Sequence, residues 1–146
     1  MFEKNFFKTL ASHSKGENQM KLGTFMSISA VVGLLFGLAF ILMPVQTMSM
    51  YGVALDVSGQ YLARYLGSAF LGIAAILWFA RNVMPKDEAM KAIIMGGFIM
   101  SATGFIASVF DALYGVGNSL VWSTVVIYFL LAAGFGYFQF GKSAST

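Results

Sequence analysis

Residues 22–43 read LGTFMSISAVVGLLFGLAFILM, a run that contains no Asp, Glu, Lys or Arg and is followed by Pro44. A helix needs about 20 apolar residues to cross about 30 Å of hydrocarbon, so this run predicts a membrane span. A secretory signal peptide would have an apolar part of about 7–15 residues followed by small residues at a cleavage site. This run is longer, and Pro44 to Met48 offers no such site. We therefore expect a retained transmembrane helix.

Three further apolar runs follow, and the composition agrees with a chain that faces lipid. Hydrophobic residues make up 58% of the sequence and charged residues only 10%, whereas an average soluble domain is about 25% charged. We expect an all-α, polytopic four-transmembrane-helix bundle that forms a single membrane domain over residues 1–146. The predicted parts are a lead-in at 1–20, spans at about 22–43, 61–80, 90–113 and 120–140, and a tail at 141–146.

The lead-in shows helical spacing of apolar residues. Phe2, Phe6, Phe7 and Leu10 alternate with polar residues at that spacing, which predicts a short amphipathic N-terminal helix lying in the headgroup region. A frayed end that packs on the bundle is the alternative. Ser14 and Glu17 have the spacing of a capping box, so we expect the first membrane helix to begin near Lys15.

The basic residues fix the expected orientation. Cytoplasmic loops of membrane proteins carry an excess of Lys and Arg, so both termini and the turn near 81–91 are predicted to be cytoplasmic. In the four-span interpretation only Arg64 approaches the other side. The same rule explains the net charge of +3 without nucleic acid, which we do not expect as a partner. The residues on the cytoplasmic side are Lys4, Lys8, Lys15, Lys21, Arg81, Lys86, Lys91 and Lys142.

Small residues recur at helical spacing in the first three spans. Such rows allow close helix–helix approach in lipid, within one monomer or at an interface with another subunit. They predict packing faces at Gly33 and Gly37 in the first span, at Ser68, Gly72 and Ala75 in the second, and at Gly97, Ser101, Gly104 and Ser108 in the third.

Two ionisable residues lie on the same predicted faces. Arg64 precedes Ser68 by four residues, and Asp111 follows Ser108 by three. Charges within membrane helices are costly and are usually paired or functional. We expect Arg64 and Asp111 to form a structural ion pair between adjacent spans, with Asp56 as a competing partner for Arg64. The alternative is a polar site on the outer face that binds an anion or relays protons.

Candidate metal and cofactor ligands are few. The chain has no cysteine, and His13, its only histidine, lies outside the spans, which argues against haem, zinc and catalytic-triad sites. Met43, Met48 and Met50 form a weak candidate site for Cu(I), since thioether sulfur is a soft ligand. We predict no cofactor and no enzymatic activity.

The first half of the chain resembles a group of short bacterial four-helix membrane proteins of unknown function, most strongly over residues 1–81. The resemblance is carried by FILMP at 40–44, by Tyr51-Gly52 and Asp56, by LARYLG at 62–67 and by WFAR at 78–81. It implies a bacterial origin, and that Arg64 belongs to the shared pattern. Small four-helix multidrug exporters are similar in span count, but the glutamate of their first helix has no counterpart in residues 22–43.

Two functions remain open at this stage. The first is a non-catalytic subunit of the bacterial inner membrane that packs against and stabilises a larger complex, with lipid and other subunits, or a second copy, as its partners. The second is a small transporter or a lipid-binding or small-molecule-binding protein that uses the Arg64/Asp111 end.

Overall fold

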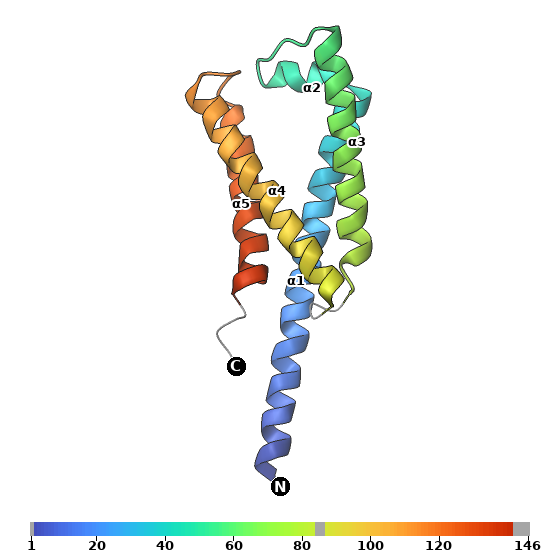
Figure 1. Ribbon diagram of the computed structural model, residues 1–146, viewed down its shortest axis with the longest axis vertical. Helices are drawn as coiled ribbons and strands as arrows, with labels where there is room; N and C mark the ends of the chain where they lie inside the picture. The colour runs from blue at the N-terminus through green and yellow to red at the C-terminus, as the bar shows by residue number, and fades with distance from the viewer. Residues whose placement is uncertain (1, 84–86, 142–146) are drawn as a thin grey trace.

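A computed structural model describes residues 2–83 and 87–141, with side chains from residue 20 onward. In this part of the chain the backbone forms five α-helices and no strand (Figure 1). They are α1 (Phe2–Leu42), α2 (Pro44–Met50), α3 (Val57–Ala80), α4 (Glu88–Leu113) and α5 (Val121–Phe140).

Four helical segments are long and apolar enough to cross a membrane, as the sequence predicts. They are Met20–Leu42, Val57–Ala80, Glu88–Leu113 and Val121–Phe140, with 20 to 26 residues each. At most 28% of the residues in each span are buried in the isolated chain, which leaves the other faces available to lipid. The expected bounds differ mainly in the second span, which begins at Val57 rather than Tyr61.

The beginning of the first membrane helix was predicted wrongly. The structure has one helix from Phe2 to Leu42, without a new start near Lys15. Helical backbone can continue through a capping-box pattern when the next turn is also helix-forming, because the cap is a weak preference. Among the predicted features, the side chains of Phe2, Phe6, Phe7, Leu10 and His13, the segment 84–86 and the tail at 142–146 lie outside the described residues.

The connection between the first two spans contains a helix that the sequence analysis missed. Pro44 does end α1, but it also occupies the first turn of α2, where the missing N–H of proline costs nothing. The second span then starts directly after Asp56, whose Oδ1 accepts a hydrogen bond from the Gly59 N–H at 2.6 Å. This N-cap explains why α3 begins four residues before Tyr61.

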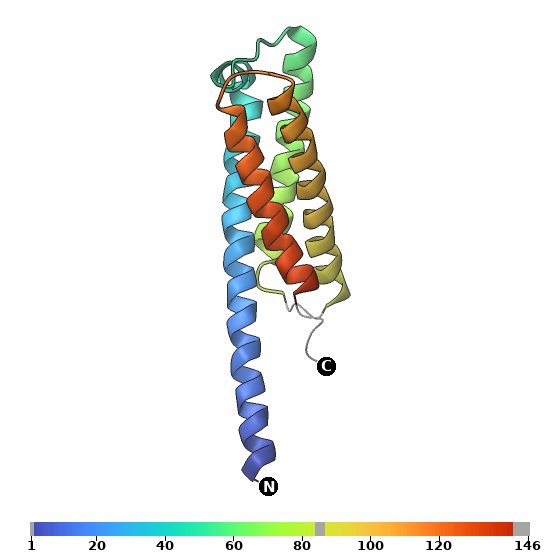
Figure 2. The same cartoon turned by 90° about the vertical axis from the view of Figure 1, so that its left-hand side faces the viewer.

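The helices pack as two antiparallel pairs, α1 with α3 and α4 with α5. Backbones in the first pair approach closely at glycines. A Cβ atom added to Gly67 would lie 2.8 Å from the Gly37 carbonyl oxygen, and one added to Gly33 would lie 3.4 Å from the Ala74 Cβ. In Figure 2 the α4–α5 pair lies in front of the α1–α3 pair and crosses it obliquely.

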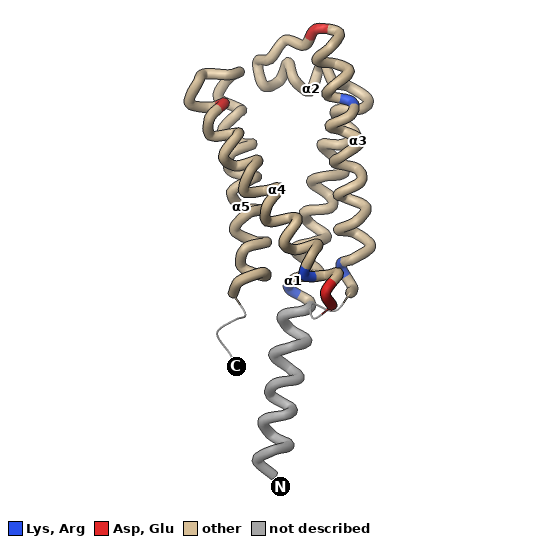
Figure 3. The backbone as a smooth tube through the Cα atoms, in the orientation of Figure 1, with Lys and Arg blue, Asp and Glu red and all other residues tan. Residues whose placement is uncertain are grey.

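The two pairs meet in a common core at one end of the bundle. Residues from all four long helices bury one another there: Leu22, Met26, Ala30, Leu77, Ala80, Met90, Ile94 and Phe135. Toward the opposite end the two pairs diverge (Figure 1). We call the first end the basic end, because Lys21, Arg81 and Lys91 lie there, and the other the α2 end (Figure 3).

Side chains at the basic end hold the turn between α3 and α4. The Arg81 guanidinium lies 3.6 Å from the Trp78 ring centroid and donates to the Trp78 carbonyl oxygen at 2.8 Å. Lys91 forms an ion pair with Glu88 at 2.6 Å, in the first turn of α4. Both arrangements suit a polar membrane boundary, where aromatic rings and basic side chains gather.

Candidate ligand-binding cavity

A cavity of about 300 Å³ lies between the two helix pairs, on the α2 side of the common core. Its walls come from α1, α3, α4 and α5, and the connection that contains Tyr51 and Val53 closes it at the α2 end. It exists because the pairs diverge after their contact at the basic end. Small-molecule sites in proteins have volumes of about 300–1,000 Å³, so this cavity suits a compact or narrow ligand.

Three phenylalanines form the wall on the α1–α3 side. Ring centroids of Phe36 and Phe40 lie 6.4 Å apart, and Phe70 of α3 is 6.3 and 6.1 Å from them. Phe36 and Phe40 are one helical turn apart, next to the Gly33–Gly37 row that brings α3 close to α1. The close approach therefore places Phe70 against both rings.

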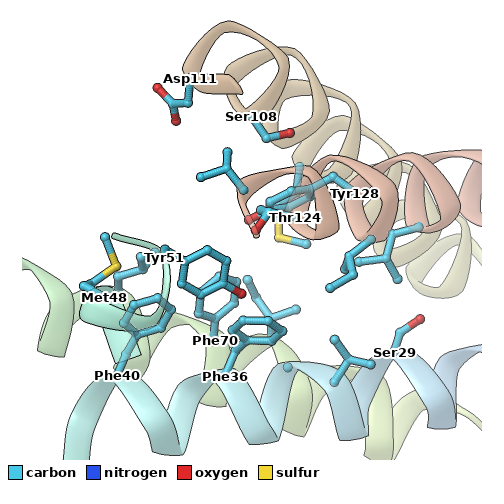
Figure 4. Close-up of a pocket in the computed structure, with 18 of the residues that line it drawn as sticks. Ser29, Phe36, Phe40, Met48, Tyr51, Phe70, Ser108, Asp111, Thr124 and Tyr128 are labelled. Atoms are coloured by element: carbon cyan, nitrogen blue, oxygen red, sulfur yellow. The ribbon is translucent and has the colours of Figure 1, made fainter. Parts of the chain in front are cut away.

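The opposite wall comes from α4 and α5 and carries more polar atoms. Ser108 and Asp111 of α4, and Thr124 and Tyr128 of α5, all line the cavity (Figure 4). Phe135 closes its inner end and is only 1% exposed. The cavity is thus largely apolar, with polar groups concentrated on one side.

Hydrogen bonds from the backbone and the side chain of Asn118 join the two helix pairs at the α2 end. The Asn118 N–H donates to the Tyr51 carbonyl oxygen at 2.8 Å, and Asn118 Nδ2 donates to the Met50 carbonyl oxygen at 2.8 Å. Asn118 Oδ1 also accepts from the Leu120 N–H at 2.9 Å, which fixes the start of α5. Gly52 and Gly117, with φ of 76° and 77°, make the two turns that meet here. We call these contacts the Asn118 latch.

Two hydroxyl groups on the cavity wall donate hydrogen bonds to carbonyl oxygens of their own helices. Ser29 Oγ donates to the Phe25 carbonyl oxygen and Ser108 Oγ to the Phe105 carbonyl oxygen, each at 2.9 Å.

In the described part of the chain, the Asp111 carboxylate has neither an ion pair nor a hydrogen-bond donor. It is also the only formally charged side chain among the described residues that line the cavity.

The cavity opens between α3 and α4. Leu66 of α3 is 47% exposed and Val116, after α4, is 45% exposed, yet both line the cavity. Asp111 is exposed as well and lies with them. These two helices do not pack along each other, in contrast to the α1–α3 and α4–α5 pairs. An apolar molecule could therefore enter sideways, from a surrounding bilayer.

The expected pair of Arg64 and Asp111 is not formed. Arg64 is exposed, and the described residues give its guanidinium no ion pair or hydrogen bond. The reason is the face that α3 turns toward α1. Ala63, Gly67 and Ala74 lie on that face, whereas Arg64 lies on the adjacent face, which points away from the bundle. Asp56, the expected competing partner, caps α3 instead.

The predicted packing rows have different outcomes. Gly33 and Gly37 lie against α3, whereas Ser68 and Gly72 are exposed, and a Cβ added to Gly72 would meet no atom within 4 Å. On α4 the row lies against α5: a Cβ on Gly97 would be 2.8 Å from the Phe135 ring, and Gly104 touches Tyr128. Ser101 is 0% exposed, and no described residue forms a hydrogen bond with its Oγ. Ser108 lines the cavity.

The methionine site has no support in this arrangement. Met48 lines the cavity, but Met43 and Met50 are 53% and 66% exposed. The described residues also contain no group of three His, Cys, Asp or Glu side chains that could hold a metal ion.

Sequence analysis missed the aromatic residues that build the cavity. The sequence singles out Phe40 and Tyr51 only as parts of the motifs that carry the resemblance, Phe36 only as an apolar position of a span, and Phe70 and Tyr128 not at all. The available signal was the one-turn spacing of Phe36 and Phe40 beside two glycines.

Comparison of the chain with protein-family models, curated proteins and solved structures found no match.

Proposed function

We propose that this chain is a membrane protein that binds an apolar molecule, taken from the bilayer, in the cavity between its two helix pairs. The observation that carries the proposal is the cavity of about 300 Å³ with its aromatic wall and its opening between α3 and α4. Sites for small apolar ligands combine such walls with a few polar groups that orient the ligand. The proposed function is binding alone, with no chemical reaction at the site.

Photoaffinity labelling tests this proposal directly. The probe is decanol with a diazirine group on its chain, added to the purified protein in an uncharged maltoside detergent. We expect mass spectrometry to locate adducts on cavity residues such as Phe36, Phe70 and Tyr128. Adducts only on outward-facing positions of the helices would contradict the proposal.

A matched pair of variants separates cavity labelling from surface labelling. Val32 lines the cavity, and its neighbour Val31 points outward and is 45% exposed. Val32→Phe fills part of the cavity and should reduce the labelling severalfold, because overpacked side chains occupy the ligand's space. Val31→Phe makes the same change on the outer surface and should leave the labelling unchanged.

A second candidate function is a non-catalytic subunit that packs against a larger membrane complex. It is favoured by the outward face of α3, where Arg64, Ser68, Gly72 and Ala75 are all exposed. Small residues allow a further helix to approach closely, and a partner helix with a carboxylate near Arg64 would neutralise its charge. We therefore propose a membrane helix of another subunit as the occupant of this face.

Native mass analysis after extraction in mild detergent tests the subunit proposal. Gly72→Leu should abolish a heavier assembly that the unchanged chain forms. Gly96→Leu is the control, because an added Cβ at Gly96 also meets no atom within 4 Å, but on α4. Equal loss with both variants, or with neither, would contradict a specific role for this face of α3.

For the location of the chain we propose the bacterial inner membrane, with the basic end in the cytoplasm. Support comes from the resemblance to short bacterial membrane proteins and from the basic residues Lys21, Arg81 and Lys91 at one end of the bundle (Figure 3). The α2 end and the Asn118 latch would then face the periplasm.

A further inference from the structure

The Asp111 carboxylate lies at the mouth of an apolar cavity. It comes from the last turn of α4, and Figure 4 shows it at the edge of the cavity nearest the α2 end. In the described chain no cation or N–H group contacts it. A carboxylate next to hydrocarbon loses part of its hydration, and such groups in membrane proteins commonly have a functional counter-charge. The missing counter-charge could be supplied by a ligand.

The rings across the cavity favour the same kind of ligand. Tyr51, Phe36, Phe40 and Phe70 lie on the side opposite Asp111 (Figure 4). The faces of aromatic rings attract cations, and quaternary ammonium groups are often bound by such rings. An anionic head would instead meet the carboxylate and the negative ring faces. The electrostatics of the cavity therefore select against anions.

We propose that the ligand of this cavity is an amphiphile with a single ammonium head, which binds at the mouth between Asp111 and the facing rings, and a narrow apolar body, which extends inward toward Phe135. This inference rests on the proposed binding function and names its ligand class. A volume of about 300 Å³ is at the lower end for ligand sites and suits one chain or a compact ring system. The ammonium group can belong to a free amphiphilic amine or to a lipid headgroup.

Competition against the diazirine–decanol probe tests the proposal in maltoside detergent. The competitors are decyltrimethylammonium, decanol and decyl sulfonate, which share one chain and differ in head charge. Asp111→Asn keeps the size of the side chain and removes its charge. Asp87→Asn is the control, since Asp87 is an exposed carboxylate at the other end of the molecule that makes no cap hydrogen bond.

The cation should lose about tenfold in competing strength when Asp111 becomes Asn, which is the size of one charge-assisted contact. Decanol should compete equally against both proteins, and decyl sulfonate should compete better against Asp111→Asn. Comparing each competitor between the two proteins cancels its partition into detergent. Asp87→Asn should behave like the unchanged chain for all three competitors.

Each outcome has a definite meaning. If decyltrimethylammonium and decanol change equally, or not at all, in Asp111→Asn, the ammonium proposal is wrong while cavity binding stands. If the probe does not label the cavity, both proposals fall. Added phosphatidylethanolamine that displaces the probe, where phosphatidylglycerol does not, supports the proposal with a lipid headgroup as the source. Displacement by the free amine alone supports it with a free amphiphile.

Discussion

At the scale of single residues, glycines decide how closely α1 and α3 approach, and two glycines only five residues apart on α3 have opposite roles. Gly67 lies against the Gly37 carbonyl oxygen, whereas Gly72 on the same helix faces open space. Because lipid is as apolar as a leucine side chain, a small residue on the outer surface carries no penalty. The sequence pattern therefore does not distinguish the two.

Leucine substitution at these two glycines gives contrasting predictions for stability. Gly67→Leu forces a side chain against backbone atoms of α1 and should lower the stability of the chain by about 1–3 kcal/mol. Gly72→Leu should change it by less than about 0.5 kcal/mol, as for most surface positions. Thermal unfolding in maltoside detergent measures both. Equal effects would mean that the observed face of α3 is not the packing face.

Arg64 and Asp111 should behave as independent residues, contrary to the pair expected from their spacing. Independent sites contribute additively to stability, usually within about 0.5 kcal/mol. The single changes Arg64→Ala and Asp111→Ala and their combination therefore form a double-mutant cycle with no coupling. A coupling energy above about 1 kcal/mol would instead indicate that Arg64 and Asp111 form the ion pair.

At the scale of elements, hydropathy and turn chemistry predict the four spans, and the remaining features depend on packing. Residues 22–43 are charge-free and long enough to cross a bilayer, so the helix in that region follows from its composition. α2 has only seven residues and shows too little periodicity to be recognised. The cavity depends on the angle between two helix pairs, which hydropathy does not encode.

The candidate site was predictable only in part, for a related reason. Asp111 stands out in any reading because a carboxylate within an apolar run is rare. The residues that line the cavity with Asp111 do not stand out in the sequence, since Phe36, Phe70 and Tyr128 are three aromatic residues among many in this chain. Their common position results from contacts between α1 and α3 and from the divergence of α4 and α5.

The Asn118 latch should stabilise the α2 end of the molecule. Asn118→Ala removes the side-chain hydrogen bonds to Met50 and Leu120 and should cost about 1–2 kcal/mol. Hydrogen exchange of the amides in 51–56 and 117–121 should become faster, whereas exchange at the basic end should not change. Asn82→Ala, an exposed asparagine near the basic end, is the control. Unchanged exchange in both segments would show that the Asn118 latch does not stabilise the α2 end.

At the scale of the whole molecule, charge determines the expected orientation in the membrane. Reporter fusions after Asn82 and after Thr146 should read cytoplasmic, and a reporter inserted in the connection at 51–56 should read external. This pattern follows from the excess of basic residues on one side of the bundle. A cytoplasmic reading for the connection would overturn both the orientation and the four-span arrangement.

The division into two helix pairs also determines the order in which the site can be built during synthesis. The ribosome completes α1 and α3, and with them the Phe36–Phe40–Phe70 wall, before any of α4 or α5 exists. A nascent chain that ends near residue 83 has one wall of the cavity facing lipid, without Asp111 and without Asn118. Domains that form from the N-terminus pass through such incomplete stages. The cavity is therefore complete only after α4 and α5 have been added, and a chain interrupted between the two pairs lacks one of its two walls.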